Sequence, residues 1–334
     1  MAQLVKLLDY VSRYQNDLSR YPTQYIRLKN SQWDRMKRQW EMEGDLSDWR
    51  QIPDEPEEQA EETKWFSSIF KLLKRTESAE VIEEEEVRVD EDETNIFDFN
   101  PNIIYQPKSL EELRKLYLDQ LFHFQLKWAS STMLERSRMD ANYIRDPLLR
   151  SFTQKLPDSF LLFYYPILKV KKAPVELDVI LITPVDCLCI KVLEQEDVAA
   201  FIGNNERFWT KKLGDDETKV LNPLIGLNRM EKIITGIISA QGIEFPVRKI
   251  LISRNGYIDY PGVPFDTKII DRRTYDNWFL SLQKSVTPMK FNQFKAAQSI
   301  LDNVQTTAVS RLFGEPIEPE EDEGQNRNEI DINE

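Results

Sequence analysis

Two pairs of side chains on neighbouring predicted strands have the residue types that phosphodiester chemistry uses. Glu176 and Asp178 lie two residues apart in one apolar run, and Cys189 and Lys191 lie two residues apart in the next. Residues two apart on a strand share one face of a sheet, so adjacent strands would bring these four side chains together. Carboxylates in such a place can hold Mg²⁺, which polarises a phosphate and lowers the pKa of an attacking water, while a lysine steadies the developing charge.

The elements around these residues predict an α/β domain over residues 156–285, with a central mixed sheet flanked by helices. Runs rich in β-branched and aromatic residues predict consecutive strands, the last two forming a hairpin, at 159–170, 175–184 and 186–194. Asn222 as N-cap, Pro223 in the first turn and Gly242 after the end predict a helix between them. Further strands are expected at 246–254 and 268–271, and helices at 272–282 and 290–304, the last within a C-terminal segment at 286–312.

Helices are also predicted before this domain, in an N-terminal arm at 1–50 and a lead-in at 109–155. Apolar residues spaced by three and four predict amphipathic helices at 4–18 and 25–42. Ser109 and Glu112 form a capping-box signature that begins a long helix to about residue 138. A shorter helix is expected at 146–155. Neither N-terminal helix should fold alone, so both are expected to dock on the main domain or on a protein partner.

The formal charge of −13 at pH 7 is concentrated in three short stretches. Residues 53–63, 77–93 and 315–334 together carry −23, which leaves about +10 on the rest of the chain. This composition predicts disordered acidic linkers within 51–108 and a disordered acidic tail at 313–334. The mildly basic remainder permits a nucleic-acid partner without requiring one, since solvated surface lysines give the same balance.

Residues 64–75 interrupt the acidic linkers with six apolar side chains and basic residues at both ends. Such an amphipathic helix can dock on its own protein, enter the groove of a protein partner or make peripheral contact with an anionic membrane. All three alternatives stay open from the sequence.

Cysteine and histidine are too few for several kinds of site. Cys187 and Cys189 lie too close along a strand to bridge comfortably, and they fit a reducing compartment. A His/Cys zinc centre lacks ligands, and a Ser-His-Asp triad would depend on His123, whose apolar neighbours indicate a core or boundary position. There is no run of eighteen apolar residues and no cleavable leader, which predicts a cytoplasmic protein without a transmembrane segment.

The order of these motifs resembles the NERD (nuclease-related domain) family, whose members typically show an E-x-D strand, a strand ending in E-x-K, a Trp-containing segment and an N-P-L helix start. The matches, spread over about 50 residues, are Glu176-Leu177-Asp178, Lys191, Phe208-Trp209 and Asn222-Pro223-Leu224. The resemblance implies a restriction-endonuclease-like, PD-(D/E)XK fold with Asp178, Glu176 and Lys191 as the catalytic set. It also implies Mg²⁺ on Asp178 and Glu176.

The chain departs from that pattern at its centre. Cys189 stands where the family has glutamate, and a neutral thiol is a poor ligand for a hard cation. Gly226 stands where the family often has glutamine, and the upstream helical glutamate has only Asp146 as a counterpart. Glu194, three residues after Lys191, could act as a migrated carboxylate.

Three hypotheses follow. In the first, the catalytic centre is degenerate, Asp178 and Lys191 form an inherited ion pair, and this bacterial protein is a binding or assembly module without a cofactor. In the second, it is a Mg²⁺-dependent DNA or RNA nuclease that uses Glu194. In the third, residues 64–75 recruit it to a partner or a membrane. Candidates for nucleic-acid binding are Trp209, Asn222 and Arg229, although tryptophan at such spacing more often belongs to the core.

Overall fold

The computed structural model describes residues 1–43, 46, 103, 105–132, 134–170, 173–194 and 198–310. The predicted linkers, the segment 64–75 and the acidic tail lie outside these residues. Within the described part, no helix has both the length and the apolar character needed to cross a membrane.

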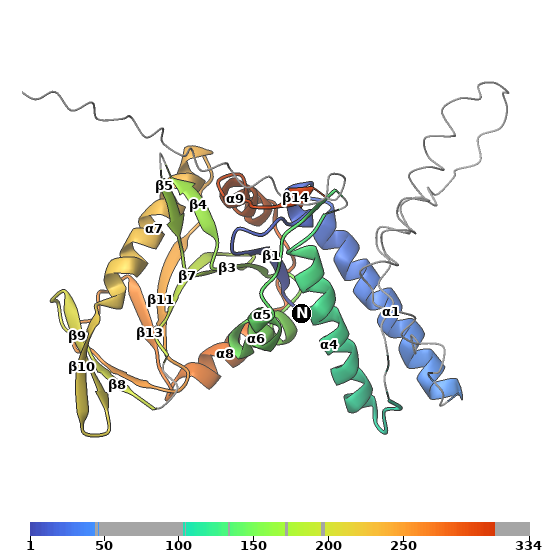
Figure 1. Ribbon diagram of the computed structural model, residues 1–334, viewed down its shortest axis with the longest axis horizontal. Helices are drawn as coiled ribbons and strands as arrows, with labels where there is room; N and C mark the ends of the chain where they lie inside the picture. The colour runs from blue at the N-terminus through green and yellow to red at the C-terminus, as the bar shows by residue number, and fades with distance from the viewer. Residues whose placement is uncertain are drawn as a thin grey trace, which may run out of the picture.

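The central feature is a six-stranded mixed sheet (Figure 1). Its strands, in spatial order, are β1 Gln3–Leu7, β3 Leu161–Tyr164, β6 Val179–Ile182, β7 Cys187–Val192, β11 Val247–Ile252 and β13 Thr267–Ile270. Strand β6 is antiparallel to both of its neighbours, and the other pairs are parallel. Every residue of β3 and β6 is buried, because helices cover the sheet on both faces.

Helices flank this sheet, as the sequence predicts. Helix α7 (Pro223–Ala240) packs along β7 and β11, with α9 (Phe291–Leu301) beside it. On the other side of the sheet in Figure 1 lie α6 (Pro147–Lys155) and α8 (Tyr275–Gln283), where the rings of Phe152 and Phe279 stack. The coarse expectation of an α/β protein with a helix-flanked mixed sheet is therefore confirmed.

The N-terminal helices are partly confirmed. Helix α1 (Tyr21–Glu43) lies alongside α4 (Leu110–Trp128), with Trp33 packed on Tyr117 at 5.3 Å between ring centroids. Helix α4 ends at Trp128, ten residues earlier than predicted, because Ser130 and Ser131 turn their hydroxyls back onto its last carbonyls. His123 is exposed on α4, so its predicted core or boundary position is wrong.

The helix predicted at 4–18 is wrong. Residues 3–7 form the buried strand β1, which pairs in parallel with β3 from Gln3 opposite Leu161 to Leu7 opposite Tyr164. A short 3-10 helix, η1 (Arg13–Gln15), follows. The backbone groups of β3 need a partner at the sheet edge, and this long-range pairing outweighs the helical spacing of the local apolar residues.

Two of the predicted strands are each divided in two. The run 159–170 gives β3 and β4 (Ile167–Val170), and the run 175–184 gives β5 (Ala173–Glu176) and β6. Strands β4 and β5 form a separate antiparallel hairpin. The β6–β7 hairpin is confirmed, with Ile182 opposite Cys187.

A second sheet, which the sequence reasoning missed, has the order β10-β9-β8-β12. Its strands are β8 Ala200–Ile202, β9 Phe208–Leu213, β10 Asp216–Leu221 and β12 Tyr257–Asp259. The remaining described elements are α5 Asn142–Arg145 and the small pair β2 Glu135–Arg136 and β14 Val309–Ser310.

Candidate site at one edge of the main sheet

Most of the polar side chains that the sequence singles out lie along one edge of the main sheet. This edge is the line of strand ends, not an edge strand. The parallel strands β3, β7 and β11 end there, and the antiparallel strand β6 begins there. This topology brings residues 165, 178, 191, 194 and 254 to the same edge. Ligand sites of α/β sheets commonly lie at the carboxyl ends of the parallel strands.

Asp178 and Lys191 form an ion pair at this edge. The register of β6 and β7 sets Val179 opposite Ile190, so the two residues beyond them face each other. Lys191 Nζ donates to Asp178 Oδ1 at 2.7 Å and to Oδ2 at 2.9 Å. The Lys191 side chain is 31% exposed and the Asp178 side chain 18%, so water only partly screens the attraction between them. The aspartate and the lysine thus meet on one face, as their spacing predicts.

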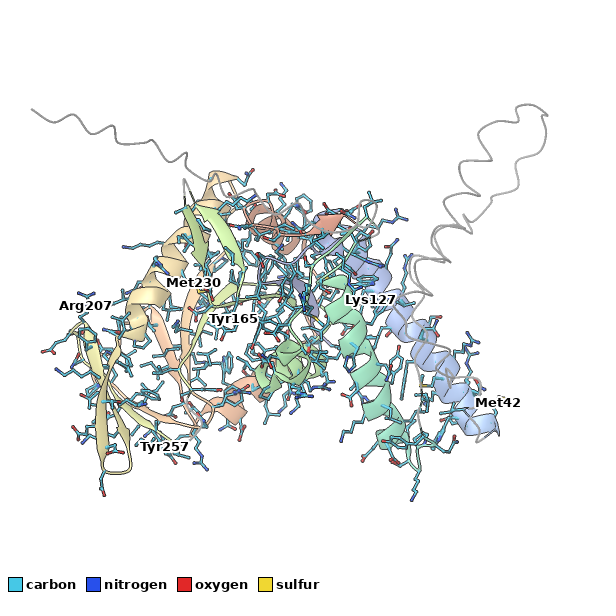
Figure 2. The ribbon with its side chains drawn as sticks, viewed as in Figure 1. Met42, Lys127, Tyr165, Arg207, Met230 and Tyr257 are labelled. Carbon is cyan, nitrogen blue, oxygen red and sulfur yellow. The ribbon has the colours of Figure 1, made fainter. Side chains whose placement is uncertain are left out.

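Tyr165 adjoins this pair in a strained backbone conformation. Its φ of 49° lies in the left-handed region, which a non-glycine residue rarely adopts. Burial, and next the negative charge of Asp178, raise the pKa of the Tyr165 hydroxyl to about 12. The phenol therefore stays protonated at neutral pH and can act as a hydrogen-bond donor. In Figure 2 it lies near the middle of the molecule.

Asp146 connects helix α6 to the same region. Its Oδ1 accepts from the backbone N–H groups of Leu148 and Leu149, which caps the helix, and its Oδ2 accepts from the Tyr164 hydroxyl at 2.6 Å. The NERD resemblance makes Asp146 the counterpart of the family's helical glutamate. Its carboxylate instead caps α6 and contacts β3.

Glu194 is held by Arg254 in a two-point ion pair. Arg254 Nε lies 2.6 Å from Oε1 and Nη2 lies 2.7 Å from Oε2, and the backbone N–H of Arg254 also donates to Oε1. Both side chains are about one fifth to one quarter exposed. Both oxygens of the Glu194 carboxylate therefore accept from the planar guanidinium.

Cys189 and Glu176 do not complete the constellation. Cys189 is buried, and hydrogen bonding to Cys187 together with burial raises the pKa of its thiol well above the ordinary value. It therefore remains neutral. Both cysteines are free thiols. Glu176 lies in the β4–β5 hairpin, opposite Ile167 and exposed to solvent.

The residues present do not fit a Mg²⁺ site. A hard cation prefers several carboxylate or carbonyl oxygens, whereas Asp178 is already paired with Lys191, Glu194 with Arg254, and the glutamate position is a buried neutral thiol. Among the residues that the structure describes, no three His, Cys, Asp or Glu side chains are grouped closely enough to hold a metal ion.

Two of the three nucleic-acid candidates serve the fold. Trp209 is fully buried in the small sheet, and its Nε1 donates to the Asn204 carbonyl at 2.9 Å. Asn222 caps α7 by accepting from the Leu224 N–H, and its amide donates to the Glu206 carbonyl at 2.9 Å. Only Arg229 is exposed, on the outer side of α7.

Tyr165 and Arg254 are the site residues that sequence reasoning missed. Arg254 follows the end of β11 by two residues, the same offset at which Glu194 follows β7. Because parallel neighbours end at one edge, that shared offset was a usable signal. Tyr165 gave no such signal, since its position depends on a turn between β3 and β4 that the apolar run concealed.

Comparison with known proteins gives one partial match. At 32% identity over 126 residues, the chain is similar to an RNA 2',3'-cyclic phosphodiesterase from Geobacillus stearothermophilus. The match covers 37% of this chain and 36% of that protein, so it spans about a third of either. No family model matches the sequence, and no solved structure matches it. The similarity is therefore to a part of that phosphodiesterase.

Proposed function

We propose that this chain is a nuclease-related protein that binds RNA and does not cleave it with a bound divalent cation. The observation that carries the second half is that two candidate metal ligands, Asp178 and Glu194, are both ion-paired, while Glu176 is exposed in the β4–β5 hairpin. Releasing Asp178 for a cation would leave the partly buried Lys191 unpaired, and releasing Glu194 would do the same to Arg254.

RNA as the ligand is supported by two independent features. The partial match is to a protein named for action on RNA, and the chain outside its three acidic stretches carries about +10, which permits a polyanion as ligand. The resemblance of the E-x-D, Lys and N-P-L motifs to the NERD family fits the same reading.

The experiment uses the full chain with a labelled single-stranded RNA, in Mg²⁺, in Mn²⁺ and in chelator. We expect a gel shift of equal strength in all three conditions, and intact RNA on a denaturing gel after long incubation. Lys191→Ala should leave the RNA just as intact. Chelator-sensitive cleavage that Lys191→Ala abolishes would overturn the proposal in favour of a metal-dependent nuclease.

A second candidate is hydrolysis of a terminal phosphodiester, which the name of the partial match specifically favours. It is tested with a short RNA that ends in a 2',3'-cyclic phosphate, by following its conversion to a linear phosphate. Turnover by the wild type that is lost in both Asp178→Asn and Lys191→Ala would place the activity at this edge. An unchanged cyclic end would remove this candidate and leave the binding role.

A further inference from the structure

Along β8, β12 and the start of β9, the side chains of the small sheet alternate between a buried face and an outer face. Phe201, Trp209 and Ile258 point inward and are buried, whereas their neighbours on β8, β9 and β12 point outward. The strand register sets the outward residues in three rows, which are Tyr257-Ala200-Lys212-Glu217, Asp259-Ile202-Thr210-Lys219 and Phe208-Leu221.

Two aromatic rings stand on this outer face, each with a guanidinium over it. Phe208 is 46% exposed and has the Arg207 guanidinium 5.7 Å from its ring centroid, and Tyr257 is 38% exposed with that of Arg273 at 5.8 Å. Figure 2 labels Arg207 and Tyr257 at opposite ends of the small sheet. Strand spacing and rise per residue put the two rings roughly 16 Å apart on a diagonal.

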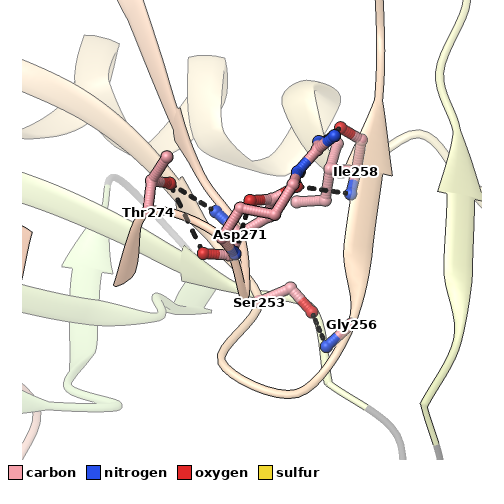
Figure 3. A network of polar contacts seen from close by, with 6 residues as sticks. Ser253, Gly256, Ile258, Asp271 and Thr274 are labelled. Atoms are coloured by element: carbon pink, nitrogen blue, oxygen red, sulfur yellow. Dashed lines mark hydrogen bonds and ion pairs between the residues drawn. The ribbon is translucent and has the colours of Figure 1, made fainter. Parts of the chain in front are cut away.

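The cation over Tyr257 is fixed in place by the polar network of Figure 3. Arg273 Nε and Nη2 donate to Asp271 Oδ2 at 2.9 and 2.5 Å, and the Ile258 N–H donates to the same oxygen. Asp271 N–H in turn donates to Thr274 Oγ1. Arg273 Nη2 also donates to the Ile258 carbonyl at 3.3 Å, and the side chain stays 63% exposed although it is anchored.

Cations and carboxylates both lie on this face. Arg207, Lys212, Lys219 and Arg273 lie on or beside it, as do Glu217 and Asp259, and Lys212 is paired with Glu217 and Arg273 with Asp271. Lys219 has no ion pair among the described residues. Proteins that bind single-stranded nucleic acid use exposed aromatic rings with cationic side chains beside them on an open sheet. The bases stack on the rings, and the phosphates contact Lys or Arg.

We infer that the outer face of the β10-β9-β8-β12 sheet is a binding surface for single-stranded RNA. Bases stack on Phe208 and Tyr257, and the phosphates between them contact Arg207, Lys219 and Arg273. The choice of RNA rests on the proposed function. The surface itself is distinct from the ion-paired edge of the main sheet, because it involves none of those residues.

The test measures fluorescence anisotropy of a labelled oligouridylate of about twelve nucleotides, within the site sizes of single-strand binders, on the full chain. Phe208→Ala and Tyr257→Ala should each weaken binding about ten-fold, as expected for loss of one stacked base. Phe208→Tyr and Tyr257→Phe should bind like the wild type because the rings remain.

Phe291→Ala is the matched control. Phe291 is also an exposed ring, 71% accessible, with the Lys295 ammonium 4.6 Å from its centroid, but it lies on α9. Its loss should leave binding unchanged. Lys219→Gln should lower the slope of log affinity against log salt by about 0.7, the value for one phosphate contact on a single strand. A duplex of the same length should compete poorly, because its bases are already stacked.

The outcomes separate this inference from the proposed function. If the wild type binds RNA and Phe208→Ala/Tyr257→Ala binds equally well, the surface assignment is wrong and the binding role stands. If the wild type binds no RNA, both are wrong. If instead the wild type self-associates in sedimentation and the double variant does not, the face joins two copies of this chain and the RNA surface is overturned. Thermal melts of each variant check that it folds. If an alanine variant fails to fold, the binding of the ring-retaining variants and the salt slope of Lys219→Gln test the surface assignment instead.

Discussion

At the scale of single residues, the sheet edge is distinguished by carboxylates that all have partners. Asp178 has Lys191, Glu194 has Arg254, and Asp146 has the Tyr164 hydroxyl and the first turn of α6. A partly buried charge that loses its partner costs more than the pair contributed, so such an arrangement resists exchange of a lysine for a metal ion.

The first residue-scale prediction concerns the Asp178–Lys191 pair. Asp178→Ala should lower the free energy of unfolding by about 1–2 kcal/mol, between the values for exposed and buried pairs, because Lys191 loses its partner. Urea unfolding of both single variants and of the double variant gives the coupling energy, expected at about 1 kcal/mol. Strictly additive losses would show that the pair contributes nothing.

The second concerns Lys6, which is buried in β1 and donates to the Tyr10 carbonyl and to Thr306 Oγ1. Burial lowers the pKa of its ammonium from 10.5 to about 7. Between those pH values Lys6 binds more protons in the unfolded chain than in the folded one, so the contribution of Lys6 to stability rises with pH. Burial also lowers the pKa of the Met1 amine, from 8.0 to about 6, so the clearest window is above pH 8.

Urea midpoints at pH 8 and 9.5 measure that slope. The stability of the wild type relative to Lys6→Met should rise over this interval, because the raised pKa values of Cys189 and of buried tyrosines act in the opposite direction but equally in both proteins. Lys232→Met, which removes an exposed lysine of α7 that does not act on Lys6, is the control and should keep the wild-type slope. A Lys6→Met protein with an undiminished slope would contradict the assignment.

At the scale of elements, local signals predicted local structure well. The cap and proline at residues 222 and 223 located the start of α7, and the short connection after Ile182 located the β6–β7 hairpin. From the hairpin and the two-residue period, the meeting of Asp178 with Lys191 followed. These features depend on neighbours in the chain, which is why a single sequence contains them.

Long-range features could not be predicted in the same way. Strand β1 pairs with β3 across more than 150 residues of chain, and Glu194 meets Arg254 across 60. Strands β9 and β10 are rich in charged residues because one face is open to solvent, so their apolar alternation is weak. Burial of Trp209, rather than exposure, depends on packing against Tyr260 from a strand 50 residues later.

A third prediction belongs to the junction of α6 with β3. Asp146→Ala removes both the helix cap and the acceptor for the Tyr164 hydroxyl, and should destabilise the protein by about 2–3 kcal/mol. Tyr164→Phe removes only the second contact and should cost about 1 kcal/mol. Asp146→Asn keeps an oxygen for the cap and should lie between the two in urea unfolding. Equal stability of Asp146→Ala and Tyr164→Phe would mean that the cap is without effect.

At the scale of the whole molecule, the main sheet and the small sheet are linked by the chain segment between β11 and β13. The chain passes from β11 through β12 of the small sheet and returns to β13, and residues 253–274 tie the crossing together (Figure 3). The Arg272 N–H also donates to the Gly256 carbonyl at 3.0 Å. The orientation of the proposed RNA surface relative to the sheet edge therefore depends on this crossing.

Gly256 is the point at which that crossing is tightest. A Cβ added there would lie 2.7 Å from the Ala199 carbonyl oxygen and 2.7 Å from Ser253 Oγ, closer than side-chain carbons approach other atoms. Gly256→Ala should therefore force β8 and β12 apart, lower stability by about 1–3 kcal/mol and speed amide exchange in those two strands. The β6–β7 hairpin, which makes no contact with Gly256, should keep its protection.

Gly236→Ala is the matched control, since a Cβ at this position on α7 meets nothing within 4 Å. It should stabilise the protein by up to about 1 kcal/mol, because alanine favours the helix over glycine. If Gly256→Ala instead exchanged uniformly faster across both sheets, the two would unfold as a single cooperative unit. In that case the surface on the small sheet could not move independently of the paired edge, and an RNA strand bound on one would be held in a fixed position relative to the other.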